Sequence, residues 1–275
     1  NLVYYPTPSY SHQRAILALT ERLVKDGHEL FVISPNAVPG LSHHENYTFV
    51  DLSYSYKYFS EGDTDDAVNL QRPWSKWELP KVFEPSYELT KNQLRTDNFL
   101  RFKQHVESNR IKFDVVIGES FYTPFTCGLT RVLAGSAPII TMITLTTDYI
   151  MEDHLGSITH LSFLPSKFDH YGYTPRMKLW QKIENWFSNF YMVSSIEEMM
   201  NSAARSYFSE IYGSKTEKLL DKCWKNTSLT LVTSNPLYFY PRALGPNVIE
   251  VGAATHHSPQ ESSEGNIYLN LTVIR

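Results

Sequence analysis

Residues 2–34 read LVYYPTPSYSHQRAILALTERLVKDGHELFVIS, and they contain a complete strand–helix–strand unit. The apolar run at 2–5 predicts a short buried strand, which ends at the Pro-rich turn at 6–9. Apolar residues then recur at helical spacing over 11–25, and a second apolar run at 29–34 predicts the next strand. Because a strand, a helix and a strand follow one another within about 34 residues, the two strands are expected to be parallel.

The same alternation continues along the chain. Strands that alternate with helices predict an α/β fold with a doubly wound, mostly parallel sheet. We expect one large domain at 1–252 and a polar, Ser-rich tail or linker at 253–275. Residues 53–85 break the pattern and are expected to form a long excursion with short helices. Further strands are expected at 48–52, 113–118, 138–145 and 229–233, and further helices at 87–109, 177–187 and 195–207.

Composition and charge argue against several functions. A net charge of −4 and a pI near 6.2 lack the basic footprint of a nucleic-acid binder. No run of 18 apolar residues is present, so no membrane-spanning helix is expected. Two cysteines, Cys127 and Cys223, are too few for a disulfide framework. Neither a metal site nor a dinucleotide or P-loop site is expected, because ligand spacings and glycine-rich phosphate loops are missing.

Three N-glycosylation sequons point to the secretory pathway. Each places an asparagine two residues before a serine or threonine, and such a tripeptide is the acceptor for N-linked glycans. Short motifs of this kind also arise by chance, so the alternative is an unmodified surface asparagine. The predicted glycosylation sites are Asn46, Asn226 and Asn270.

His12 is the first candidate catalytic residue. Ligands of doubly wound sheets bind beyond the carboxyl ends of the strands, and this rule selects the loop after residue 5, at whose end Ser11 is the expected N-cap of the helix. A helix N-terminus carries partial positive charge, which disfavours protonation of an imidazole. We therefore interpret His12 as a neutral general base, and the alternative is a capping or packing histidine.

Glu119 is the second candidate, because it follows the predicted strand at 113–118 directly. A carboxylate there could accept a hydrogen bond from His12, fix the tautomer of the ring and stabilise the imidazolium. The alternative is a solvated loop carboxylate or the cap of the next segment.

At this point the sequence resembles the animal UDP-glycosyltransferases, the UDP-glucosyl and UDP-glucuronosyl transferases. Four blocks carry the resemblance, in the family's order and over almost the whole chain. The opening block looks more like the insect and baculovirus members than the vertebrate ones. The blocks are the opening Ser-His motif with the Asp-Gly-His turn, the strand that ends in an acidic residue, a Thr-Pro-x-Met helix start and the run before the interdomain linker, at 8–32, 113–119, 173–185 and 240–252.

The resemblance implies a GT-B glycosyltransferase, in which two Rossmann-like domains face each other across a cleft. The chain would be the N-terminal, acceptor-binding half, while a C-terminal half would bind the UDP-sugar. His12 would deprotonate an acceptor hydroxyl and Glu119 would orient it, and one displacement would invert the anomeric carbon. The family's acid is usually aspartate, so Glu119 is one methylene longer.

The acceptor is expected to be a small lipophilic compound with a hydroxyl group. Phe, Trp and Tyr make up 14% of the chain, and such side chains line apolar ligand pockets. By the resemblance we assign acceptor binding to Ser11, Tyr122, Phe125 and Trp180. The three aromatic residues are equally compatible with plain packing.

The resemblance also implies the setting of the protein. It predicts detoxifying conjugation in the lumen of the endoplasmic reticulum, or secretion, with no cofactor besides the UDP-sugar as co-substrate. The donor-binding half and the C-terminal membrane anchor of the family are expected to be absent from this chain, which ends at Arg275, so the isolated chain should be nearly inactive. Homo-oligomerisation is left open. The alternative is a truncated, non-catalytic form that binds small lipophilic ligands or partner subunits.

Overall fold

The computed structural model of the chain describes residues 1–60, 75–144, 152, 154–158, 160–166, 174–221, 227–234 and 241–252. Within these residues a seven-stranded sheet has the order β3-β2-β1-β4-β5-β6-β7, and all neighbouring strands are parallel. The strands are β1 (Leu2–Tyr4), β2 (Leu30–Ser34), β3 (Tyr47–Asp51), β4 (Val116–Glu119), β5 (Ile139–Ile143), β6 (Thr227–Val232) and β7 (Val248–Glu250).

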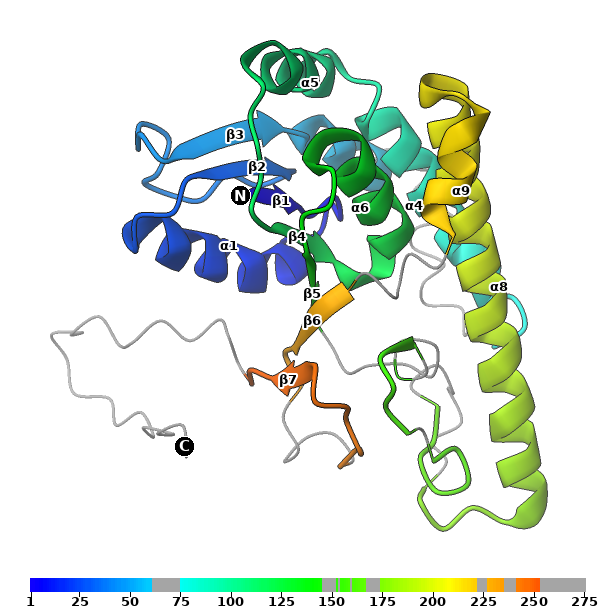
Figure 1. Cartoon of the computed structure of the whole chain (residues 1–275). Coiled ribbons are helices and arrows are strands. Elements are labelled where there is room, and N and C mark those ends of the chain that lie inside the picture. Colours follow the sequence, from blue (N-terminus) through cyan, green and yellow to red (C-terminus); the bar gives the residue numbers. More distant parts are fainter. Residues whose placement is uncertain are drawn as a thin grey trace, which may run out of the picture.

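Helices connect the strands and cover both faces of the sheet (Figure 1). The longer ones are α1 (Tyr10–Lys25), α4 (Leu79–Gln93), α5 (Asp97–Asn109), α6 (Thr123–Leu129) and α8 (Leu179–Tyr212). The shorter ones are η1 (Ser53–Tyr56), α2 (Lys57–Ser60), η3 (Ser120–Tyr122), the π-helical turn η4 (Thr130–Ala134), η5 (Ser214–Thr216) and α9 (Glu217–Leu220). Among the described helices, none is long and apolar enough to cross a membrane.

The side chains of β1 alternate between two buried clusters, one on each face of the sheet. Leu2 and Tyr4 pack with apolar residues of α5, α6 and α8, whereas Val3, and Tyr5 directly after the strand, pack with those of α1. A parallel sheet needs this double cover, because its strands are apolar on both faces. The fold is therefore the expected α/β class, a Rossmann-like doubly wound sheet.

All six strands expected from the sequence are present, with ends that differ by a few residues. The seventh, β7, was not expected. This strand has only three residues and lies at the edge of the sheet. Because Ile249 and Glu250 are exposed, the sequence contains no apolar run that would predict it. The only antiparallel pairing in the described part of the chain is the isolated bridge between Ile158 and Ala243.

The single helix expected at 87–109 is wrong, because two helices occupy the region. Thr96 takes an extended conformation and its side chain accepts a hydrogen bond from the backbone N–H of Phe99, so it caps a new helix. The carbonyl of Leu94, in the break, accepts a hydrogen bond from the hydroxyl of Tyr207 at 2.9 Å. A contact over such a sequence distance is not visible in local periodicity.

The helices expected at 177–187 and 195–207 are helical almost throughout, but they are parts of one continuous helix, α8, so the break between them is wrong. Neither proline nor glycine occurs between Leu179 and Tyr212, so no residue breaks the backbone pattern. Two polar residues of this helix, Asn185 and Asn189, are buried and hydrogen-bonded to the segment at 160–166.

Two further expectations concern the ends of elements. Ser11 is not the N-cap of α1: Ser9 holds that position, without a capping side-chain bond, and the helix begins at Tyr10. The tail at 253–275 and part of the excursion, 61–74, lie outside the described residues.

Gly128 tests the packing of α6 against α8. A Cβ atom at this position would overlap the ring of Phe208, which is fully buried and cannot withdraw. We expect Gly128→Ala to lower the free energy of unfolding by about 1–3 kcal/mol, measured by urea denaturation.

Ser202→Ala, at an exposed position of α8, is the control and should change the stability by less than about 0.5 kcal/mol. A Gly128→Ala variant as stable as the parent would contradict the close approach of the two helices.

Candidate active site

The loop between β1 and α1 is fixed by buried glutamine side chains. The Nε2 of Gln13 donates to the carbonyls of Tyr5 at 3.0 Å and Thr7 at 2.6 Å, and its Oε1 accepts from Ser34 Oγ at 2.6 Å. From α4, the Nε2 of Gln93 donates to the carbonyl of Pro6 at 2.8 Å. The loop is therefore held from α1, from the end of β2 and from α4.

The site lies where the strand order reverses. From β1 the chain proceeds to β2 and β3 on one side, while β4 pairs with β1 on the other, with Tyr4 opposite Gly118. Ligands of open α/β sheets bind at such a switch point, beyond the carboxyl ends of the strands. His12 in the first turn of α1 and Glu119 at the end of β4 both project there.

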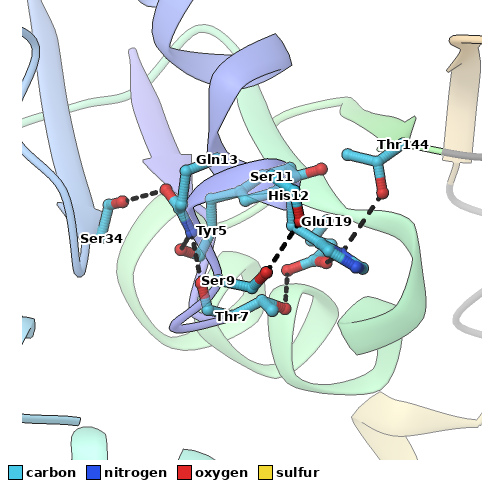
Figure 2. Close-up of polar contacts among 9 residues, drawn as sticks. All are labelled: Tyr5, Thr7, Ser9, Ser11, His12, Gln13, Ser34, Glu119 and Thr144. Carbon is cyan, nitrogen blue, oxygen red and sulfur yellow. Dashed lines mark hydrogen bonds and ion pairs between the residues drawn. The ribbon is translucent and has the colours of Figure 1, made fainter. Parts of the chain in front are cut away.

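Figure 2 shows His12 and Glu119 turned towards each other. The Nδ1 of His12 lies 3.3 Å from the Oε1 of Glu119, although 107 residues separate them in the sequence. The Oγ1 of Thr144, beyond the end of β5, lies 3.3 Å from the same Nδ1. No described residue hydrogen-bonds the Nε2 of His12, so the second ring nitrogen is available to a ligand.

The carboxylate of Glu119 is buried and anchored from its other side. Its side chain is 5% exposed, whereas that of His12 is 40% exposed. The hydroxyl of Thr7 donates to Oε2 at 2.5 Å, so each carboxylate oxygen has a partner. A buried carboxylate without partners is costly, and these contacts hold it in one orientation.

The electrostatics of His12 differ from the expectation drawn from the helix start. The hydrogen bond to Glu119 raises the pKa of His12 above 6.5, burial lowers the pKa, and the charge of Glu119 raises it further. The carboxylate thus outweighs the factors that disfavour the imidazolium. A raised pKa brings His12 closer to neutral pH, where a general base works best.

The structure brings some of the other predicted residues to this place and puts others elsewhere. Ser11 is exposed beside His12, with its hydroxyl 3.0 Å from that of Ser9. Tyr122 is buried next to the pair, and burial followed by the charge of Glu119 raises its pKa. Phe125 lies in the core against Tyr207 and Phe208, and Trp180 is exposed at the start of α8.

Aromatic rings from α4 and η3 extend the site beyond Tyr122. The ring of Phe121 lies 5.1 Å from that of Tyr122, 5.9 Å from that of Tyr87 and 5.2 Å from that of Phe83. Sequence reasoning did not select Phe83, Tyr87, Phe121, Thr7 or Gln13. A signal existed for Gln13, a polar residue in the apolar stripe of α1, and for Phe121, two residues after Glu119.

The structure describes one of the three predicted glycosylation sites and only part of the chain in which a metal site could lie. Among the residues that the structure describes, no three His, Cys, Asp or Glu side chains could hold a metal ion. Asn46 is half-buried just before β3, and Asn226 and Asn270 lie outside the described residues.

The sequence was compared with models of protein families and with curated proteins. The family model described as UDP-glucoronosyl and UDP-glucosyl transferase matches residues 2–270. No curated protein matches the chain.

The coupling of His12 to Glu119 can be measured directly. We expect Glu119→Gln to lower the pKa of His12, because the neutral amide removes the charge-assisted bond while the burial remains. A proton NMR titration of the histidine ring signals, assigned with His12→Gln, gives both values.

Glu21→Gln, on the outer side of α1, is the matched control and should leave the pKa of His12 unchanged.

The raised pKa of His12 also affects stability. Its contribution to the free energy of unfolding is fully present below about pH 6.5, and it is lost as the pH rises through the pKa of His12 in the folded state. Equal pKa values in the parent and in Glu119→Gln would contradict the pairing.

Proposed function

Because the chain belongs to the UDP-glucuronosyl and UDP-glucosyl transferase family, we propose that it supplies the acceptor site and the general base of a sugar transfer. Members of the family transfer a sugar from a UDP-sugar to an acceptor. We assign the acceptor the chemistry of a small lipophilic hydroxyl compound, as in conjugating detoxification. The UDP-sugar is a co-substrate, for which we expect a separate donor-binding domain.

The contact between His12 and Glu119 carries the proposal. In the neutral ring Nδ1–H donates a hydrogen bond to the carboxylate of Glu119, and the unprotonated Nε2 faces the acceptor. Nε2 takes the hydroxyl proton while the acceptor oxygen bonds to the anomeric carbon, and the bond from that carbon to UDP breaks on the opposite face. The configuration at this carbon is inverted, and Glu119 stabilises the imidazolium that forms.

The aromatic rings beside the pair support a lipophilic acceptor. Phe83 and Phe121 are only partly buried, and Tyr87 and Tyr122 back them from the core. Rings in this arrangement offer an apolar wall that leads to a few polar groups, the usual composition of a small-molecule site. Ser11, exposed next to His12, would be the first polar group that the acceptor meets.

We expect His12→Ala to abolish transfer in a protein that carries this chain with a donor-binding half. Removing a general base lowers the rate by about 10²–10⁴-fold. The affinity for the acceptor should change little, because the aromatic wall is intact. Transfer from UDP-glucose to 4-nitrophenol gives the rate, and calorimetric titration with 4-nitrophenol gives the affinity.

His105→Ala, on the exposed side of α5, is the control and should retain full activity. Turnover that survives in His12→Ala would contradict the catalytic assignment. Saturable binding of the phenol with no turnover in the parent protein would favour the other candidate, a non-catalytic binding module for lipophilic ligands.

Cys127 supports placement in the secretory pathway. It is fully buried and disulfide-bonded. Disulfides form and persist in oxidising compartments such as the lumen of the endoplasmic reticulum and are rare in the cytosol. Together with the sequon at Asn46, the disulfide favours a lumenal or secreted protein.

Alkylation of the native protein tests this placement. The protein is unfolded without a reductant and treated with iodoacetamide, and mass spectrometry counts the labels. We expect neither of the two cysteines to be labelled, because both are held in the disulfide. The same protein reduced before unfolding is the control and should take up the label at both. Labelling of Cys127 without a reductant would point to a reducing compartment.

A further inference from the structure

The first turns of α8 present an apolar face to solvent. Besides Trp180, which is 58% exposed, five large side chains on them each expose between 47% and 75% of their surface. Their spacing of four, three, one and three residues keeps them on one side of the helix, so they form a continuous stripe. We name these residues the α8 stripe: Leu179, Ile183, Trp186, Phe187 and Phe190.

The opposite side of the same turns is polar and buried. The Nδ2 of Asn185 donates to the carbonyls of Leu161 at 2.8 Å and Leu164 at 2.9 Å, and its Oδ1 accepts from the backbone N–H of Ser166 at 2.8 Å. The hydroxyl of Ser166 donates to the Oδ1 of Asn189 at 3.0 Å. Polar contacts therefore hold the first turns of α8 against the rest of the protein, and their apolar side remains exposed to solvent.

The size and chemistry of the α8 stripe distinguish it from scattered surface residues. Trp186 stacks on Phe190 with 5.6 Å between the ring centroids, and its edge meets Phe187 at 5.1 Å. The stripe runs for about 18 Å along the helix axis. In Figure 1 these yellow-green turns of α8 run along the outside of the molecule, beyond the sheet. Contiguous exposed apolar surface of this kind marks an interaction site.

Cations flank the α8 stripe. Arg176, Lys178 and Lys182 precede it or lie within its first turns, and they form no ion pair with a described residue. The acidic residue among these turns, Glu184, is neutralised by an ion pair with Lys76. The surroundings of the stripe are therefore positively charged, whereas the chain as a whole is acidic.

We propose that the α8 stripe docks on an anionic membrane interface. Tryptophan and phenylalanine side chains enter the boundary between headgroups and acyl chains, and lysine and arginine beside them attract anionic headgroups. The helix lies along the surface, with the Asn185 side facing the protein and the aromatic side facing the lipid. A protein partner would bury the aromatic rings equally well, but it would neutralise the three cations only if its surface were acidic, whereas an anionic membrane meets both requirements along the whole helix.

Flotation of the full chain with lipid vesicles tests the proposal. Binding is expected to vesicles that contain phosphatidylserine, to be weaker with phosphatidylcholine alone, and to fall as salt is added. The triple variant Trp186→Gln, Phe187→Gln and Phe190→Gln should lower the partition constant by at least about tenfold. Arg176→Gln with Lys182→Gln should lower binding to the phosphatidylserine vesicles only.

The matched control is Leu100→Gln with Ile211→Gln, which removes exposed apolar side chains of α5 and of the far end of α8. It should bind like the parent. The substituted positions are exposed, apart from the half-buried Lys182, so circular dichroism and thermal unfolding should match among the variants. Brominated lipid should quench the tryptophan fluorescence of the parent more than that of Trp186→Phe, which keeps the apolar surface.

Two outcomes would overturn the proposal. Equal vesicle binding by the parent and the triple variant would remove the α8 stripe from any membrane contact. A dimer that light scattering detects in the parent but not in the triple variant, without vesicle binding, would assign the stripe to a second copy of the chain.

Discussion

The parallel pairing of β1 with β4 is the constraint on which the candidate site depends. It places the carboxyl end of the first strand beside that of a strand more than a hundred residues later, and the chain turns to opposite sides of the sheet from there. His12 enters from the helix after β1 and Glu119 from the end of β4, so the backbone ladder sets the distance between their side chains. The loop at residues 5–9 adds Thr7, and Gln13 and Gln93 keep this loop in place.

The buried carboxylate shows how one contact changes the chemistry of another residue. A histidine in the first turn of a helix faces partial positive charge, which alone would favour the neutral ring. Glu119 reverses the balance, because its hydrogen bond and charge both favour the imidazolium. The hydroxyl of Thr7 donates to the other carboxylate oxygen and keeps the glutamate side chain directed at His12. The hydroxyl group of Thr7 thus helps to set the pKa of the His12 ring through the orientation of Glu119.

α8 joins two environments in one continuous helix. Its C-terminal half lies in the core, where Tyr207 and Phe208 pack against Phe125 of α6 and the hydroxyl of Tyr207 reaches the break between α4 and α5. Its N-terminal half buries asparagines and exposes aromatic rings. This arrangement is the reverse of the usual surface helix, whose apolar side faces the core. When hydropathy is averaged over the whole length of α8, the buried polar side and the exposed apolar side of its first turns cancel and neither is visible.

Local patterns in the sequence determined the elements and the outline of the fold. Apolar runs and helical spacing predicted β1, α1 and β2, and the rule for parallel sheets then selected the loops that carry His12 and Glu119. Only the tertiary structure decided that Thr7 binds Glu119, that Phe125 lies in the core, and that Thr96 separates two helices through contacts around Leu94. These facts depend on residues far apart in the chain. The spacing of a strand or a helix reports which side of an element is apolar, but not which surface that side will meet.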